Sequence, residues 1–402
     1  MTPEKSRFAL LLAWPISSMG GVNGVARNLL HEFQAAKQMP LMAIEMSGKE
    51  IREVPVAGDC TWPVLTMPPL PTWNPHRPVQ SSIGFCLLAP FALWRLISIC
   101  RRYSISVLNP HFIGLEYLML AVLRKSGFFR GKLILSFHGA DIREMMQSRG
   151  VKRWLSRVLL RSADFLVPCS NGLGEEVLMF VPECAPRTVV IHNGIDTARF
   201  LARASEPYEL PKNFAGRRII LNIGAYEFKK GHDILVKAFA LVKAKRSDVA
   251  LVISGQRSSI EIDQLGKELG VRQDMLLLEN TPPAKVAALL KQADVFALST
   301  RSKKGFYGEG FAIALLEAGA AAKPVVAADS CGVSELIEDG ITGRVVPPED
   351  PEALAEGICS LLEDPARASQ MGRCLHQKVV QNFTNQDMYR KYAELIIGPP
   401  NF

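Results

Sequence analysis

Short runs of apolar residues alternate along most of the chain with segments in which apolar positions recur at helical spacing. Apolar runs of about four to eight residues bounded by turn residues are typical of buried parallel strands, and amphipathic helices cover the faces of such sheets. The pattern therefore predicts an α/β protein. The expected strands are residues 8–14, 106–109, 133–137, 165–168 and 188–192, then 219–223, 250–254, 275–278, 295–298, 324–327 and 343–346.

These strands fall into two sets, each large enough for its own doubly wound sheet. A chain of 402 residues is also longer than a domain with a single hydrophobic core usually is. Residues 196–217 lie between the sets; they contain Pro207 and Pro211 and show little periodicity, which is typical of a linker. We expect two Rossmann-like domains, residues 1–205 and 206–378, facing a central cleft. A terminal helix within 379–402 would cross back to the first domain.

Composition adds two constraints on partners and chemistry. The net charge of +8 favours anionic partners without choosing between nucleotides, lipids and nucleic acid. The eight cysteines form no CxxC pair and no zinc-like spacing with histidine, so we expect free thiols in a reducing cytosol.

The longest apolar run, residues 85–94, is interrupted by Pro90 and is shorter than the roughly 20 residues that a bilayer-spanning helix needs. We therefore expect no transmembrane span. Two interpretations stay open for this run: a buried helix, or a membrane-facing interfacial helix flanked by Arg95, Arg101 and Arg102.

Residues 309–317, EGFAIALLE, place two carboxylates eight positions apart at the start of an apolar helix, whose opening residues should be 311–316. The first N–H groups of such a helix favour an anion such as a phosphate. At about 1.5 Å per helical residue, Glu309 and Glu317 would be roughly 12 Å apart and would bind different parts of one long ligand. A nucleotide-sugar has that form, with hydroxyl clusters at its ends and a diphosphate between them. The alternative is a pair of ordinary acidic residues at a helix start.

Three further segments carry candidate chemistry. Gly20 and Gly21 follow the first strand and let the backbone approach a phosphate, although the spacing is not GxGxxG and close strand–helix packing is the alternative. His138 ends a strand and can donate to a sugar hydroxyl, or it is a structural histidine with Asp141 capping the next helix; His111 is a second choice. Lys230 precedes Gly231 and can reach a diphosphate, or it is a solvated surface lysine.

Together, His138-Gly139, residues 193–196 (NGID), Lys230-Gly231, EGFAIALLE and residues 322–326 (AKPVV) resemble the retaining glycosyltransferases of the GT-B fold, glycosyl transferases group 1. The resemblance spans residue 20 to about residue 356.

The resemblance implies a role for each matching position. Glu309 would hold the transferred sugar, Glu317 the nucleotide ribose, Lys230 the diphosphate and His138 the donor sugar beside the reacting carbon. The backbones of Gly20 or Gly21 and of the segment after Glu309 would complete the cradle, through Gly310, Phe311, Ala312 and Ile313.

Two positions depart from the family pattern. The arginine usual five residues before the lysine is Ala225 here, and Arg301 or Lys304 could supply the missing cation. The glutamate usual three residues after the histidine is Asp141.

The sequence thus predicts a metal-independent, cofactor-free glycosyltransferase that uses a nucleoside-diphosphate sugar, with UDP favoured by family frequency, and a glycan or lipid-linked acceptor in cell-surface polysaccharide or glycolipid synthesis. No DxD-like metal cluster precedes the diphosphate site. No nucleic acid partner is expected. The expected location is the cytoplasm, and peripheral contact with an anionic membrane would place the protein at the inner face of the cytoplasmic membrane. The alternatives are a nucleotide-sugar isomerase and a catalytically silent nucleotide-sugar-binding protein on the same fold.

Overall fold

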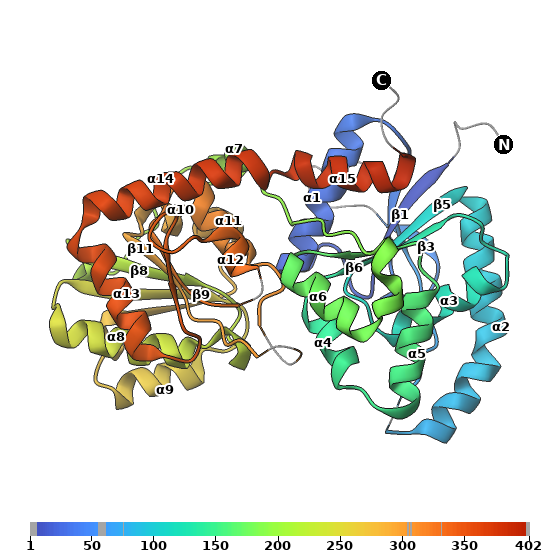
Figure 1. The fold of residues 1–402 in the computed structure, drawn as a ribbon, viewed down its shortest axis with the longest axis horizontal. Coiled ribbons are helices and arrows are strands. Elements are labelled where there is room, and N and C mark those ends of the chain that lie inside the picture. The colour runs from blue at the N-terminus through green and yellow to red at the C-terminus, as the bar shows by residue number, and fades with distance from the viewer. Residues whose placement is uncertain are drawn as a thin grey trace. The chain divides into compact units, whose positions relative to one another are not determined.

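The computed structural model describes residues 6–54, 62–74, 76–303, 305, 308–330 and 332–398. The chain divides into two compact units, one formed by Met1–Asn193 with Asn385–Phe402 and the other by Gly194–Thr384 (Figure 1). Each unit is an open, mostly parallel sheet with helices around it, as the alternating pattern predicts.

The first unit contains a seven-stranded sheet in the order β3-β4-β2-β1-β5-β6-β7. All its pairs are parallel except β3 with β4. Its strands are β1 (Arg7–Leu12), β2 (Leu41–Glu45), β3 (Arg52–Val54), β4 (Val64–Thr66), β5 (Ile105–Pro110), β6 (Lys132–Phe137) and β7 (Phe165–Pro168).

The helices of this unit are α1 (Gly21–Ala36), α2 (Pro78–Arg102), α3 (Leu118–Lys125), α4 (Ala140–Gln147), α5 (Gly150–Arg161), α6 (Asn171–Phe180) and α15 (Asn385–Ile397), with short 3-10 helices η2 (Leu115–Tyr117) and η3 (Pro182–Arg187). The terminal helix α15 packs against α1 (Figure 1). Lys132 Nζ donates to the carbonyls of Leu395 and Ile396 at 2.8 and 2.9 Å, which satisfies the carboxyl end of α15.

The second unit contains a six-stranded parallel sheet in the order β10-β9-β8-β11-β12-β13. Its strands are β8 (Arg218–Ile223), β9 (Val249–Gly255), β10 (Met275–Glu279), β11 (Val295–Leu298), β12 (Val325–Ala328) and β13 (Arg344–Val346). Its helices are α7 (Thr197–Ala202), α8 (His232–Lys245), α9 (Ile260–Glu268), α10 (Pro283–Gln292), α11 (Ile313–Ala320), α12 (Val333–Leu336), α13 (Pro351–Glu363) and α14 (Pro365–Asn382), with η4 (Lys212–Phe214), η5 (Phe228–Lys230) and η6 (Arg272–Asp274). The apolar sides of α8 and α13 meet the sheet in one core that includes Leu235, Leu251 and Ile358.

The structure differs from the predicted elements in the first unit. Residues 188–192 form no strand: Val189 and Ile191 donate to carbonyls of β7, and Thr188 makes only an isolated bridge. β2, β3 and β4 were not expected from the pattern. β3 and β4 are three residues each, and β3 is an exposed edge strand with two charged residues, so neither forms a long apolar run.

The unit boundaries also differ from the predicted domain boundaries. The chain changes unit after Asn193 rather than near residue 205, because α7 packs against α11 of the second unit. The helical tail is two helices: α14 ends at Asn382, and α15 begins at Asn385 in the first unit.

Helix α2 contains the long apolar run and continues through Pro90. By length and composition alone it could cross a membrane, which differs from the expectation drawn from the shorter run. Its second half is part of the unit instead: Ala92, Leu96, Ile99 and Cys100 are buried, and α2 packs on α3 and β5. Its first half exposes apolar side chains.

Candidate functional site

The predicted site residues lie where parallel strands end in each unit. In the second unit the segment with Lys230 follows β8, and Ser299 to Arg301 follow β11 directly. In the first unit His111 follows β5 and His138 follows β6. The carboxyl ends of strands are where open α/β sheets bind ligands.

Lys230 is held by a close approach between two loops. Gly231 adopts φ 63°, and a Cβ on it would lie 2.1 Å from the carbonyl oxygen of Ser299. Only glycine fits there. Ser299 Oγ donates to the carbonyl of Lys230 at 3.0 Å, which joins the loop after β8 to the end of β11.

The Lys230 ammonium forms an ion pair with Glu309 Oε1, which also accepts from Thr300 Oγ1 at 3.2 Å. Burial raises the pKa of the Glu309 carboxyl, but the Lys230 charge and hydrogen bond outweigh burial, so the pKa is lowered overall. Glu309 is therefore ionised at neutral pH. Lys230, predicted to bind the diphosphate, and Glu309, predicted to bind the sugar, are therefore in direct contact.

The segment after Glu309 is buried and is braced by a neighbouring turn. Phe311 and Ala312 are 4% and 3% exposed. Gly332 adopts φ 79°, and a Cβ on it would lie 2.9 Å from the Gly310 carbonyl oxygen. The helix α11 begins at Ile313, later than the predicted start at Phe311, so the helical spacing between the two carboxylates applies only from Ile313 onward.

Glu317 lies half-buried on α11. Burial raises its pKa to about 7, against the opposing charge of Arg203. It makes no hydrogen bond or ion pair with any residue that the structure describes, in contrast to Glu309. A half-buried carboxylate without a protein partner costs stability, so it is a candidate for ligand binding.

The Arg301 guanidinium is paired with a carboxylate of the protein. Its guanidinium binds Asp233 through two nitrogens at 2.8 and 2.7 Å, donates to the Phe228 carbonyl at 2.7 Å and stacks on the Phe228 ring. This pairing favours a structural role over the predicted contact with a diphosphate. The other predicted substitute, Lys304, lies outside the described residues. Sequence reasoning did not single out Arg257. Its guanidinium forms an ion pair with Glu227 Oε1 at 2.9 Å, and Glu227 is two residues after Ala225.

In the first unit, Gly20 and Gly21 are exposed at the start of α1, whose first turn has no acidic residue and no side-chain cap. The preceding loop is held by buried Asn23, which accepts from Trp14 Nε1 at 2.6 Å and donates to the carbonyls of Pro15 and Ser18. The amino end of α1 is thus presented as a potential anion site.

Asp141 organises the loop that carries His138. Its carboxylate accepts from the backbone N–H groups of His138, Gly139, Ile142 and Ile113 at 2.8 to 3.2 Å. Burial raises the Asp141 pKa overall, although all four hydrogen bonds oppose that rise. The shorter carboxylate therefore orders the start of α4.

The His138 ring turns towards His111 rather than towards Asp141. His138 Nε2 lies 3.0 Å from His111 Nδ1, and His111 Nε2 lies 3.0 Å from Asn109 Oδ1. Asn109 donates to the Ile134 carbonyl and to Ser136 Oγ, each at 2.9 Å, and Ser136 Oγ is 2.8 Å from the Tyr392 hydroxyl. Sequence reasoning missed Asn109, Ser136 and Tyr392; the available signal was two polar residues inside otherwise apolar strands.

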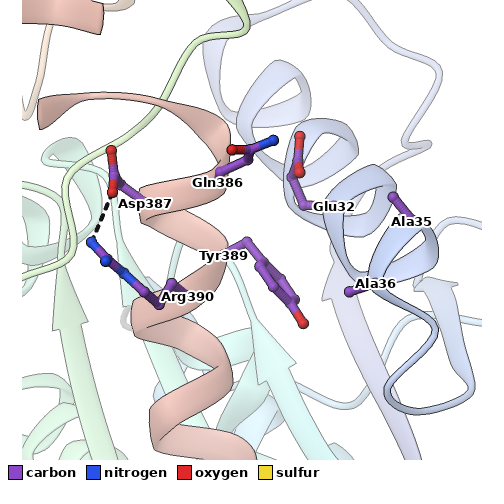
Figure 2. A pocket seen from close by; sticks show the side chains of 7 residues that line it. All are labelled: Glu32, Ala35, Ala36, Gln386, Asp387, Tyr389 and Arg390. Atoms are coloured by element: carbon purple, nitrogen blue, oxygen red, sulfur yellow. Dashed lines mark hydrogen bonds and ion pairs between the residues drawn. The ribbon is translucent and has the colours of Figure 1, made fainter. Parts of the chain in front are cut away.

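Two other features carry less information about the site. Figure 2 shows a hollow between α1 and α15 that contains none of the predicted site residues; it is lined by Glu32, Ala35, Ala36, Gln386, Asp387, Tyr389 and Arg390. Among the described residues, no group of three or more His, Cys, Asp or Glu side chains could hold a metal ion.

Comparison with known proteins places this geometry in a family. The chain matches Glycosyltransferase Family 4 over residues 19–199 and Glycosyl transferases group 1 over residues 209–374. The GDP-mannose-dependent alpha-(1-6)-phosphatidylinositol monomannoside mannosyltransferase of Mycolicibacterium smegmatis is 32% identical over 277 residues, 66% of this chain and 70% of the relative. The chain belongs to the group 1 glycosyltransferases. The amylovoran biosynthesis glycosyltransferase AmsK of Erwinia amylovora is 25% identical, over 74% of this chain and 71% of AmsK.

Solved structures agree on the architecture of this glycosyltransferase. Anabaena Alr3699/HepE, in complex with UDP and glucose, superposes with a TM-score of 0.72 at 18% identity and covers 98% of this chain and 100% of its own. Sucrose-phosphate synthase from Thermosynechococcus elongatus gives a TM-score of 0.75 at 20% identity, over 97% and 98% of the two chains. The two-sheet architecture is the GT-B fold, which confirms the predicted fold class.

Proposed function

We propose that this glycosyltransferase transfers a sugar from a nucleoside-diphosphate sugar to a glycan or lipid-linked acceptor, with retention at the anomeric carbon and without a metal ion. The observation that carries the proposal is the group in the second unit: the Lys230–Glu309 pair, followed within eight residues by Glu317, which no described residue binds.

The proposed roles follow from charge and position. Lys230 binds the diphosphate, and Glu309 accepts hydrogen bonds from sugar hydroxyls while its charge keeps the ammonium in place. Glu317 accepts from the ribose hydroxyls. The backbone from Gly310 to Ile313 completes the anion cradle in the second unit.

The proposed chemistry needs no protein nucleophile. The bond between the anomeric carbon and the diphosphate oxygen breaks, and the acceptor hydroxyl bonds to the same face of that carbon. The proton of the acceptor hydroxyl passes to the departing diphosphate oxygen. The main contribution of the protein is to stabilise the charge that develops on the leaving diphosphate, through Lys230 and helix N–H groups.

A melting-temperature screen with nucleoside diphosphates and their sugars tests the donor part of the proposal. A ligand that binds only the folded state raises the melting temperature by mass action. UDP-sugars are the donors that the sequence predicts, and GDP-mannose is the donor named for the mannosyltransferase relative. A rise for one nucleotide family that is lost in Lys230→Ala supports the assignment; no rise with any nucleotide contradicts it.

The acceptor side of the proposal rests on helix α2. The helix exposes Val79, Ile83, Leu87 and Phe91, which recur every fourth residue, together with Leu88 and Trp94; their exposures run from 57% to 74%. Exposed Arg77 precedes this face, and exposed Arg101 and Arg102 end the helix. An apolar stripe flanked by cations, in a chain of net charge +8, fits an anionic lipid surface. We propose that α2 lies on such a surface and brings the enzyme to a lipid-linked acceptor.

Vesicle co-sedimentation tests this contact. The full chain should bind vesicles that contain phosphatidylglycerol and bind pure phosphatidylcholine vesicles weakly. Phe91→Ser with Trp94→Ser should abolish the binding. The matched control is Phe128→Ser with Trp154→Ser, which removes equally exposed aromatic residues (58% and 60%) outside α2. Equal binding by both double variants would contradict the assignment of α2.

A further inference from the structure

Asparagines inside the strands orient histidines in both units by the same arrangement. In the second unit, Asn222 Nδ2 donates to the Ala297 carbonyl at 2.7 Å, and Asn222 Oδ1 lies 3.0 Å from His232 Nε2. In the first unit, Asn109 relates in the same way to the Ile134 carbonyl and to His111 Nε2. The first unit adds one step, because His111 contacts His138 in turn.

A backbone carbonyl accepts hydrogen bonds and cannot donate them, so the Asn109 amide nitrogen must face Ile134. The Asn109 oxygen then faces His111, and an amide oxygen only accepts. His111 Nε2 must therefore carry a hydrogen atom. The chemistry of the partners fixes this assignment, since hydrogen atoms are inferred from the hydrogen-bond network.

The same reasoning continues to His138. His111 is fully buried, and burial, with the nearby His138, lowers its pKa well below the ordinary value. His111 is thus neutral, and its Nδ1 has a lone pair and no hydrogen. His138 Nε2 must donate to that lone pair. Burial also lowers the pKa of His138, to about 4, so its ring is neutral and its Nδ1 carries a lone pair. No described residue hydrogen-bonds to His138 Nδ1.

We propose that Asn109 and His111 are positioning residues that hold His138 as the neutral Nε2–H tautomer, so that His138 Nδ1 accepts a hydrogen bond from a ligand hydroxyl. This reverses the direction expected from the sequence, in which the imidazole donates. The identity of the hydroxyl, on the donor sugar, rests on the proposed function; the tautomer does not.

Other polar groups around the pair leave this assignment intact. Asp141 directs its carboxylate at backbone N–H groups, including that of His138 itself. The Tyr392 ring stacks on His111 with ring centres 6.3 Å apart, and its hydroxyl contacts Ser136. The Tyr117 hydroxyl contacts the carbonyl of His111. None of these groups provides a donor to His111 Nδ1.

The direct test is long-range ¹H–¹⁵N NMR of the histidine rings in the full-length, ligand-free protein. The signals of His138 are identified by their loss in His138→Gln. We expect a protonated Nε2 and an unprotonated Nδ1 that stay unchanged from about pH 8 to pH 5.5. A proton on Nδ1, or a doubly protonated ring at pH 7, would overturn the proposal. The expected tautomer in a protein that binds no nucleotide would refute the proposed function and leave this inference standing.

Asn109→Leu provides a second readout. Leucine cannot accept a hydrogen bond, so His111 can carry its hydrogen atom on Nδ1 and donate from it to His138 Nε2. The His138 hydrogen atom then moves to its own Nδ1, and the variant should lose kcat by about tenfold relative to wild type, the effect of about one hydrogen bond. Tyr392→Phe is the matched control: it removes a hydrogen bond from the same buried cluster and should keep the wild-type tautomer. An Asn109→Leu protein with the wild-type His138 tautomer and kcat would overturn the proposal, and the wild-type spectrum decides if this variant does not fold.

Discussion

Replacing Glu317 with glutamine is expected to stabilise the protein at pH 8 while it weakens nucleotide binding. Both effects have one cause: the carboxylate is half-buried and no described residue binds it, yet it is well suited to accept two ribose hydroxyls. Glutamine keeps the shape of the side chain and removes the charge that must be desolvated.

The size of the stability effect follows from the pKa. Burial raises the Glu317 pKa from 4.5 to about 7, a difference of about 2.5 units. At about 1.36 kcal/mol per unit, this sets an upper limit of roughly 3 kcal/mol, and the partial exposure of the side chain reduces it to about 1–2 kcal/mol. As pH rises, the unfolded chain loses this proton before the folded chain does. The free energy of unfolding therefore falls between about pH 4.5 and pH 7, and the full penalty is present at pH 8.

Chemical denaturation at pH 5 and pH 8 measures this effect. Glu317→Gln should exceed wild type in stability at pH 8, and most of that advantage should be gone at pH 5. The matched control is Glu356→Gln, the same change at an exposed position of α13, which should show no such dependence. Affinity for the nucleotide-sugar should fall by about 1–3 kcal/mol at pH 8 in Glu317→Gln alone. Equal stability of wild type and Glu317→Gln at both pH values, or unchanged affinity, would refute the reasoning.

Three further substitutions test the rest of the donor site. Glu309→Gln should lower turnover by roughly a hundredfold while affinity for the free nucleoside diphosphate stays equal or rises, because the change frees Lys230; a proportional loss of both would argue against a sugar contact. Lys230→Ala should weaken binding of diphosphate-containing ligands but not of the nucleoside, as calorimetry can show, and equal losses would remove Lys230 from the diphosphate site. Arg301→Ala should lower the melting temperature, with a coupling energy to Asp233→Asn of about 0.5–3 kcal/mol in a double-mutant cycle, and should leave diphosphate affinity unchanged. A selective loss of that affinity would restore the predicted role of Arg301, and Ala225→Arg would then be expected to compensate.

The fold could be predicted because buried parallel strands leave a clear apolar signal. All six strands of the second unit coincide with expected runs. In the first unit, the three-residue strands β3 and β4 left no such signal. The change of unit at Asn193 was hidden because α7 is a short helix inside the polar segment 196–217, whose prolines follow it, and its packing on α11 places it in the second unit.

The site was less predictable than the fold because contacts between distant segments decide it. Sequence patterns located Lys230 and Glu309, but not their ion pair, which joins residues 79 positions apart. They proposed Arg301 as a substitute for the cation missing at Ala225, but they did not show its partner Asp233, which lies on α8, 68 positions away. Likewise, the tautomer of His138 depends on an asparagine of a neighbouring strand, which no local motif marks.

Sugar transfer from a nucleoside diphosphate can be followed by NMR of a donor labelled with ¹³C at the anomeric carbon. The full-length enzyme is incubated with the donor selected in the melting screen and with lipid and polysaccharide acceptor extracts. We expect a new glycoside signal with the anomeric configuration of the donor, together with one nucleoside diphosphate released per sugar transferred, and loss of both in Glu309→Gln. A changed sugar still attached to its nucleotide would identify an isomerase. A bound donor that stays unchanged, or a product of inverted configuration, would contradict the account.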